Sequence, residues 1–109
     1  MIDHTLLNPS STYTMIRNHC NESVKWNFGA VCINPVHALL ASQLLRNTEV
    51  KVCTVIGFPF GATSTKVKAY ETSLAIASGA DEIDMVMNLG ALKSRDYDRV
   101  RDDIKAVVK

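Results

Sequence analysis

Polar and apolar side chains alternate over residues 81–89 (DEIDMVMNL), and this spacing can place several polar groups side by side. If this run is a strand, its two-residue period puts one set of polar residues on the same face: Glu82, Asp84 and Asn88. A carboxylate such as Asp84 in that position can transfer protons or hold a catalytic ammonium group. It can equally be a buried acid that pairs with a lysine or arginine in a structural role. Asp84 is therefore the first catalytic candidate, with both interpretations open.

A second polar pair lies in the first apolar run, where Asp3 and Thr5 share a face by the same period. Neighbouring side chains alternate, so only one of Asp3 and His4 can point inward, and the comparison with Asp84 favours Asp3. The alternative is that Asp3 accepts hydrogen bonds from backbone amides at the start of the chain. We expect Asp3 and His4 to lie close to the C-terminal end of the first strand.

The histidines and cysteines match no pattern of a metal site. His4, His19 and His37 fall on three different expected elements, without HxxxH or HExxH spacing, so we predict no metal site. The cysteines fit neither a disulfide framework nor a paired zinc knuckle, and we expect small, reduced, buried residues: Cys20, Cys32 and Cys53.

Lysine positions argue against a covalent nucleophile within this chain. A Schiff-base lysine in a barrel should lie inside, near the C-terminal end of a strand. Lys51 begins an expected strand, and Lys93 follows the last one on a loop. The other lysines fall on or beside helices, where solvent exposure is the expectation: Lys25, Lys66, Lys68, Lys105 and Lys109.

A glycine-containing loop over residues 57–63 (GFPFGAT) joins a strand to a helix. Such loops can present amides to phosphate, but this one has neither the GxGxxG nor the GxxxxGK[ST] pattern. We interpret its two glycines as relieving backbone strain.

Four repeats of strand, turn and helix position these residues. We expect strands over 2–7, 28–33, 50–58 and 81–89, and helices over 13–26, 36–46, 64–78 and 97–108. Gly79 stands where a helix-ending glycine belongs. The first helix should bury Ile16, Cys20, Val24 and Trp26, and the last Val100, Ile104, Val107 and Val108. The alternation predicts parallel strands joined by right-handed crossovers.

Two α/β architectures share this order: a small doubly wound sheet, and half of a TIM (β/α)₈ barrel, which takes about 250 residues when complete. A strand covered on both faces should be apolar on both, whereas the Asp84 strand has a polar face. We therefore predict four parallel βα units of a half-barrel, as a single domain over residues 1–109. Its open strand edges and inner face predict a homodimer or higher oligomer that forms through those edges.

Composition excludes several classes of protein. The 109 residues are 47% hydrophobic and 21% charged, with a net charge of +1, so no basic excess indicates a nucleic-acid or membrane-surface partner. No apolar run approaches the roughly 18 residues of a membrane span, and the start does not resemble a secretory signal. We expect a cytoplasmic protein.

Four segments in the right order resemble the deoxyribose-phosphate aldolase family. They are residues 2–7 (IDHTLL), 30–35 (AVCINP), 55–62 (VIGFPFGA, followed by Lys68 and Glu71) and 79–86 (GADEIDMV). The resemblance implies a class I lyase that reversibly cleaves 2-deoxy-D-ribose 5-phosphate to D-glyceraldehyde 3-phosphate and acetaldehyde. It implies a lysine Schiff base, a phosphorylated sugar as the substrate, and neither metal nor cofactor.

The same resemblance implies roles for individual residues. Asp84 matches the family's proton-relay aspartate and Asp3 a second acid of the relay, while Thr5 and Cys32 match positions lining the substrate pocket. The family's Schiff-base lysine lies on the sixth strand and its phosphate loops near the seventh and eighth. The chain ends after the fourth unit, so it should supply the acid half of the site and be inactive, or nearly so, alone. The alternatives are a non-catalytic half-barrel that oligomerises or binds a phosphorylated metabolite, and one that complements a separate C-terminal half.

Overall fold

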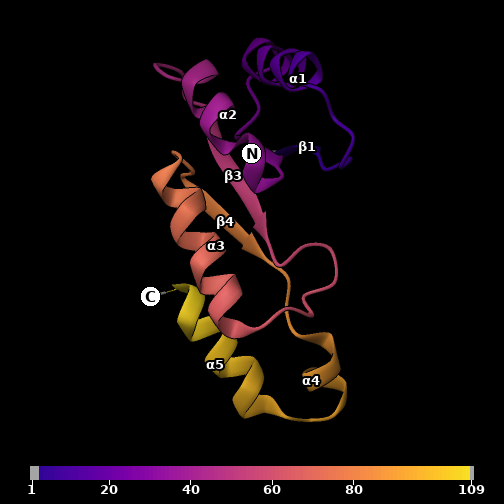
Figure 1. The fold of residues 1–109 in the computed structure, drawn as a ribbon. Coiled ribbons are helices and arrows are strands. Elements are labelled where there is room, and N and C mark those ends of the chain that lie inside the picture. The colour runs from indigo at the N-terminus through magenta and orange to yellow at the C-terminus, as the bar shows by residue number, and fades with distance from the viewer. Residues whose placement is uncertain (1–2, 109) are drawn as a thin grey trace.

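The computed structural model describes residues 3–108, in which four parallel strands alternate with helices (Figure 1). The strands are β1 (Asp3–Leu6), β2 (Ala30–Ile33), β3 (Lys51–Ile56) and β4 (Glu82–Met85). The helices are α1 (Tyr13–Lys25), η1 (Pro35–His37, a 3₁₀ turn), α2 (Ala38–Leu44), α3 (Thr65–Ala77), α4 (Leu89–Lys93) and α5 (Tyr97–Val108). Residue 2, which the sequence placed in the first strand, lies outside the described residues.

The strands lie side by side in chain order, β1-β2-β3-β4, and every pair is parallel. A doubly wound sheet reverses its strand order about the first strand, whereas a barrel wall keeps the order of the chain. The observed sheet is therefore a segment of barrel wall. Its elements run from α1 at one end of an elongated molecule, 44 × 25 × 23 Å, to α4 and α5 at the other (Figure 1).

Each face of the sheet carries its own apolar cluster. On the helix side, strand residues pack against the first two α-helices in a cluster that includes Ile16, Cys20, Val31, Ile33, Ala41, Leu45 and Val52. On the opposite side, a smaller cluster is formed by Ala30, Cys32, Cys53 and Val55, with Leu7 against it. All three cysteines are free and buried, as predicted.

Local side-chain chemistry sets the helix ends. Thr12 caps α1, because its Oγ1 accepts the Met15 backbone N–H at 3.2 Å, and Ser64 caps α3 in the same way. Gly79 follows α3 with φ +108°, which confirms its predicted role. A Cβ at Gly79 would lie 2.2 Å from the Ser42 hydroxyl, so this turn also requires a glycine for its close approach to α2.

The buried faces of the terminal helices differ from the prediction. Val24 and Trp26 are exposed, and α1 buries His19 and Ser23 instead. Their polar atoms are satisfied: the His19 Nε2 donates to the His4 carbonyl at 2.8 Å, and the Ser23 hydroxyl donates to the His19 carbonyl at 2.8 Å. Likewise α5 exposes Val108 and buries Asp103. A hydrophobic pattern misses polar residues whose hydrogen bonds remove the cost of burial.

The fourth strand is shorter than predicted. It ends at Met85, and Asn88 lies beyond it as the N-cap of α4, a helix that the sequence did not predict. The Asn88 Oδ1 accepts the Ala91 N–H at 3.1 Å, so its side chain supports a helix start rather than a strand. Asn88 therefore does not share the face of Glu82 and Asp84. Within residues 3–108, no helix combines the length and apolar character that crossing a membrane requires.

Candidate active site

The strand register brings the predicted site residues onto one face. Cα pairing aligns a row across all four strands: Thr5, Cys32, Cys53 and Glu82. Paired residues in neighbouring strands point to the same side, and so do residues two apart in one strand. Asp3 and Asp84 therefore belong to this face as well, together with Thr5 and Cys32. It is the face opposite the helices, with the smaller apolar cluster as its floor.

The polar members of this face are accessible. Asp3, Thr5 and Asp84 are exposed, whereas Cys32 is 5% exposed and forms part of the floor. The structural alternative for Asp84 was a buried pair with a lysine or arginine. Among residues 3–108 neither Asp84 nor Asp3 forms an ion pair. Both carboxylates thus face open space, and their catalytic role stays a prediction.

The pKa values of the two thiols on the floor, Cys32 and Cys53, depend on each other and on nearby carboxylates. A hydrogen bond from Cys53 lowers the pKa of Cys32, against burial and the charges of Asp84 and Asp3, which raise it. The same hydrogen bond raises the pKa of Cys53 together with burial. Sequence reasoning did not place Cys53 beside the site, although the two-residue period of its strand puts Cys53 and Val55 on the same face.

Asp3 and Asp84 lie at different levels of the sheet. Asp3 is the first residue of β1, so the expectation that it lies near the strand's C-terminal end is wrong. It lines a hollow of about 260 Å³ with Gly29, Glu49, Lys51 and Glu82 at the amino ends of the strands. Asp84 is the third of four residues in β4, nearer the carboxyl end. Thr5 and Cys32 lie between the two levels.

Two glycines set the backbone conformation of the loop after β3. Gly57 and Gly61 have φ of +68° and +65°, which confirms that they relieve backbone strain. The Gly57 N–H donates to Glu71 Oε1 at 2.8 Å. A Cβ at Gly61 would lie 2.1 Å from the Met87 carbonyl oxygen, so this loop packs directly on the segment that follows β4.

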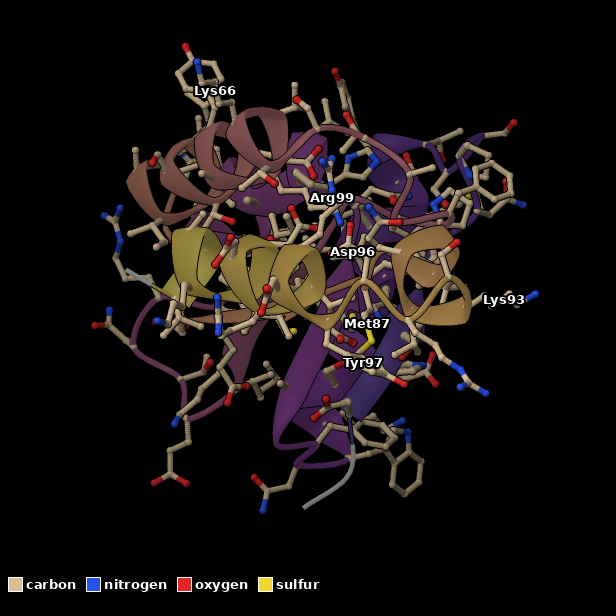
Figure 2. All side chains as sticks on the ribbon, turned by 90° about the horizontal axis from the view of Figure 1, so that it is seen from below. Lys66, Met87, Lys93, Asp96, Tyr97 and Arg99 are labelled. Atoms are coloured by element: carbon tan, nitrogen blue, oxygen red, sulfur yellow. The ribbon has the colours of Figure 1, made fainter. Side chains whose placement is uncertain are left out.

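Two expectations for the lysines need correction. Lys68 is fully buried rather than solvated, and its ammonium group donates to the Asp103 carboxylate, which also accepts a hydrogen bond from the Thr65 hydroxyl. Lys93 is the last residue of α4 rather than a loop residue. Its side chain points away from the rest of the molecule, as that of Lys66 does (Figure 2). Lys51 begins β3 as predicted.

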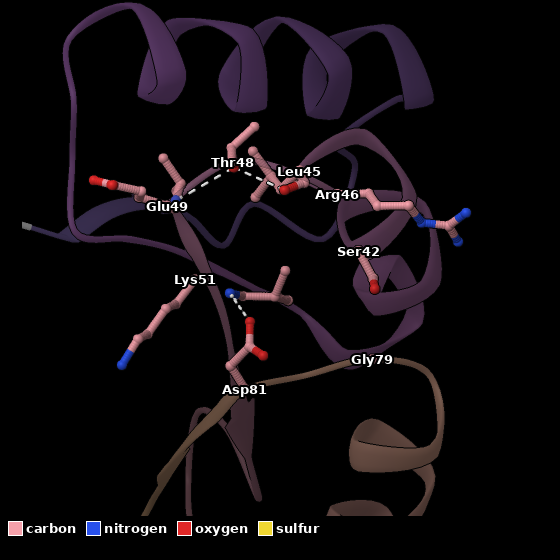
Figure 3. Close-up of a pocket in the computed structure, with 10 residues that line it drawn as sticks. Ser42, Leu45, Arg46, Thr48, Glu49, Lys51, Gly79 and Asp81 are labelled. Carbon is pink, nitrogen blue, oxygen red and sulfur yellow. Dashed lines mark hydrogen bonds between the residues drawn. The ribbon is translucent and has the colours of Figure 1, made fainter.

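A larger hollow of about 360 Å³ lies elsewhere, at the amino ends of β3 and β4 (Figure 3). There the Val52 N–H donates to Asp81 Oδ2 at 2.9 Å, which ties the start of β4 to β3. Asp84 is not among its lining residues. No group of three or more histidine, cysteine or acidic residues within residues 3–108 is arranged to hold a metal ion.

Comparison with known proteins agrees with this geometry. The DeoC/LacD family of aldolases matches residues 1–109. The deoxyribose-phosphate aldolase of Clostridium perfringens is 57% identical over 108 residues, which are 99% of this chain and 48% of the relative. That of Carboxydothermus hydrogenoformans is 58% identical, over 99% of this chain and 47% of the relative. The chain thus spans about half the length of the curated relatives it matches.

Solved structures give the same result. The Aeropyrum pernix deoxyribose-phosphate aldolase, described as a tetramer, has a TM-score of 0.88 and 34% identity over 98% of this chain and 44% of its own. An aldolase named QR15 has a TM-score of 0.92 and 42% identity, over 97% of this chain and 47% of its own. These aldolases have the TIM-barrel fold, so the prediction of a half-barrel is confirmed. The matched family model and the identities over the whole chain establish that this chain belongs to the DeoC/LacD family of aldolases.

Proposed function

We propose that this chain supplies the acid half of a deoxyribose-phosphate aldolase site. The reaction is the reversible cleavage of 2-deoxy-D-ribose 5-phosphate to D-glyceraldehyde 3-phosphate and acetaldehyde through a lysine Schiff base. The observation that supports it most is the gathering of Asp3, Thr5, Cys32 and Asp84 on one open face of the sheet. The relatives compared above are named deoxyribose-phosphate aldolases.

Each of these residues has a role that fits its position. Schiff-base formation releases water and the cleavage step moves a proton, so a carboxyl group beside the reacting carbon assists both. Asp84, exposed near the carboxyl end of β4, is the acid that faces the reacting atoms. Asp3, deeper in the half-barrel, exchanges protons with it through water. Thr5 and Cys32 line the space in which the sugar lies.

The nucleophile comes from outside the described residues. Lys66 and Lys93 point outward, and Lys68 is engaged by Asp103. Because the chain spans about half of its relatives, we assign the Schiff-base lysine and the phosphate-binding loops to the other half of a complete barrel. That half, or a second copy of this chain, covers the open edges of β1 and β4. The single domain and the cytoplasmic location stay predictions.

A complementation experiment tests the proposal. The chain is mixed with a separately produced C-terminal half of the Clostridium perfringens relative, incubated with acetaldehyde and reduced with borohydride, and the intact masses are measured. We expect an adduct on the added half and none on this chain. A stoichiometric adduct on this chain alone, at Lys93 for example, would contradict the assignment.

The role of Asp84 is tested in the same mixture. Asp84→Asn should slow adduct formation by about 10²–10⁴-fold, the usual contribution of general acid–base catalysis. Glu82→Gln is the matched control, because Glu82 lies two residues away on the same exposed face. Equal rates of adduct formation for Asp84→Asn and the unmodified chain would show that Asp84 takes no part in the reaction. Saturable binding of a phosphorylated sugar by the isolated chain would instead support the non-catalytic alternative.

A further inference from the structure

Two polar side chains of α3 meet at Gly57, the first residue after β3. The Gly57 N–H donates to Glu71 Oε1 at 2.8 Å. A Cβ on Gly57 would lie 3.2 Å from Cε of Lys68, so the stem of this lysine packs directly on the glycine. Lys68 and Glu71 are three residues apart and therefore project from one face of the helix. That face of α3 thus holds Gly57 both by packing and by a hydrogen bond.

The hydrogen bond from Gly57 gives the Glu71 carboxylate a specific task. β3 ends at Ile56, and the strand register pairs no residue of β2 or β4 with Gly57. A half-buried amide without an acceptor lowers stability, and a carboxylate is a stronger acceptor than a neutral oxygen. Among residues 3–108 Glu71 forms no ion pair, so the Gly57 N–H is its recorded partner rather than a cation.

The same glycine closes the turn over residues 57–61. The Gly61 N–H donates to the Gly57 carbonyl at 2.7 Å, so both polar backbone groups of Gly57 are engaged. Gly57 and Gly61 have positive φ angles, a conformation that other residues rarely adopt. The turn is therefore closed on itself and fixed to α3 at one residue, and Glu71 sets where it lies.

The turn over residues 57–61 packs in its own right on the segment that leads from β4 to α4 (Figure 1). A Cβ on Gly61 would collide with the Met87 carbonyl and would lie 2.8 Å from Cγ1 of Val86. The Val86 N–H also donates to the Ile56 carbonyl at 2.8 Å, which continues the bonding of β3 with β4 one residue beyond β4. Val86 and Met87 follow Asp84 by two and three residues, so a displaced turn would displace the end of the Asp84 strand.

We propose that Glu71 is a positioning residue of the aldolase site: it holds the turn over residues 57–61, and through that turn the end of β4, where Asp84 can act. This role rests on the proposed function, since it assigns Glu71 to the same site. Glu71 lies on α3, on the helix side of the sheet, whereas Asp84 faces the open side, so Glu71 does not touch the reacting atoms. A shift of about 1 Å at a reacting group can slow a reaction about 10²-fold, so an anchor outside the site affects the rate.

Amide NMR of the chain tests the anchor without any catalytic activity. Glu71→Met removes the acceptor at similar volume, whereas Glu71→Gln keeps an oxygen that can accept the same N–H. We expect Glu71→Met to shift the resonances of residues 57–61 and 84–87 and to speed exchange of the Gly57 amide about tenfold or more, and Glu71→Gln to retain most of the original behaviour. Lys66→Met, on the exposed side of α3, is the control. Unchanged resonances at residues 84–87 in Glu71→Met would overturn the inference.

Borohydride trapping in the mixture with the C-terminal half separates positioning from stability. Rates are measured per folded chain over a range of acetaldehyde concentrations. We expect Glu71→Met to lower the saturating rate about tenfold or more and to change the half-saturating concentration by less than about threefold, while Glu71→Gln restores most of the rate. A rate per folded chain that Glu71→Met leaves unchanged, or a Glu71→Gln as slow as Glu71→Met, would overturn the inference. If the unmodified chain supports no trapping, the proposed function fails, and the NMR comparison still decides whether Glu71 holds the Asp84 strand.

Discussion

Cys32 and Cys53 lie opposite each other in β2 and β3, and each sets the acidity of the other. The Cys53 thiol donates to Cys32 and lowers the pKa of Cys32, so Cys53→Ala should raise that pKa. We expect slower alkylation of Cys32 near neutral pH and a pH–rate midpoint that moves upward. Rates measured with iodoacetamide over pH 6–10, followed by peptide mass spectrometry, check this expectation.

Two comparisons make the thiol experiment specific. Cys53→Ser keeps a donor at the same place and should leave the Cys32 midpoint near that of the unmodified chain. Cys20 is fully buried and burial raises its pKa to about 11, so it should stay unmodified in the folded chain. If Cys53→Ala leaves the midpoint of the Cys32 pH–rate profile unchanged, the acidities of the two thiols are not coupled.

The two-residue period located Asp3, Thr5 and Asp84 on one face because in a strand orientation follows from position alone. Burial of Lys68 could not be predicted in this way. Its partner Asp103 lies 35 residues further along the chain, and only tertiary packing brings the two together. The sequence did not indicate that Asp103 is buried either, since a lone acid on a helix is usually exposed.

At the scale of elements, the pair of Lys68 and Asp103 joins α3 to α5. Burial alone would raise the pKa of Asp103, but hydrogen bonds from Lys68 and Thr65 outweigh it and hold that pKa below its usual value. Lys68→Met keeps the volume and leaves a buried carboxylate without its counter-charge. We expect the free energy of unfolding to fall by about 3–5 kcal/mol, measured by urea denaturation.

A double variant separates the charge from the packing. Lys68→Met combined with Asp103→Leu removes both charges, and it should recover most of the lost stability, because an apolar pair of similar volume is often as stable as a buried ion pair. Lys66→Met is the matched control on the exposed side of α3, where the change should stay within about 0.5 kcal/mol. A double variant as unstable as Lys68→Met would point to packing instead.

The contact of α1 with β1 depends on pH through His19. Burial lowers the pKa of His19 below 6.5, although its hydrogen bond to the His4 backbone acts in the opposite direction, as does the charge of Glu22. The folded chain therefore binds this proton less readily than the unfolded chain does. Its contribution to stability is full above pH 6.5 and is lost as the pH falls through the folded-state pKa.

Urea denaturation between pH 5 and pH 8 should accordingly show a lower free energy of unfolding at the acid end. His19→Gln removes the titration but retains an amide that can donate to the His4 carbonyl, so its stability should depend less on pH. His37→Gln, on η1 rather than α1, should retain the dependence of the unmodified chain. Identical slopes for His19→Gln and the unmodified chain would assign the effect to other groups.

Element boundaries were predicted where a single local signal controls them, as at Ser64 and Gly79 around α3. They were wrong where two signals compete. Residues 81–89 alternate like a strand, but Asn88 can also cap a helix, and the cap determines the end of β4. The exposure of Val67, Tyr70 and Leu74 on α3 could not be predicted either, because a stripe of apolar residues predicts burial.

In the whole molecule, the two central strands of the sheet are paired on both sides, whereas the two outer strands each have an open edge. β2 and β3 each pair with a strand on both sides, whereas β1 and β4 each pair with one strand among the described residues. Alternate amides of β1 and β4 therefore point outward at an edge, where a further strand of a complete barrel would accept them. A complete barrel would therefore close at β1 and β4, the same two strands that carry Asp3 and Asp84.

Hydrogen exchange measures this openness directly. In dilute solution, where copies of the chain are apart, amides of β1 and β4 should exchange on the order of tenfold or more faster than those of β2 and β3. The C-terminal half of the Clostridium perfringens relative should slow exchange in β1 and β4 and leave β3 nearly unchanged, because β3 already has both neighbours. Slowing confined to α3 would mean that the added half binds the exposed side of α3 and not the strand edges. Protection of β1 and β4 together with recovered borohydride trapping would link closure of the barrel to assembly of the site.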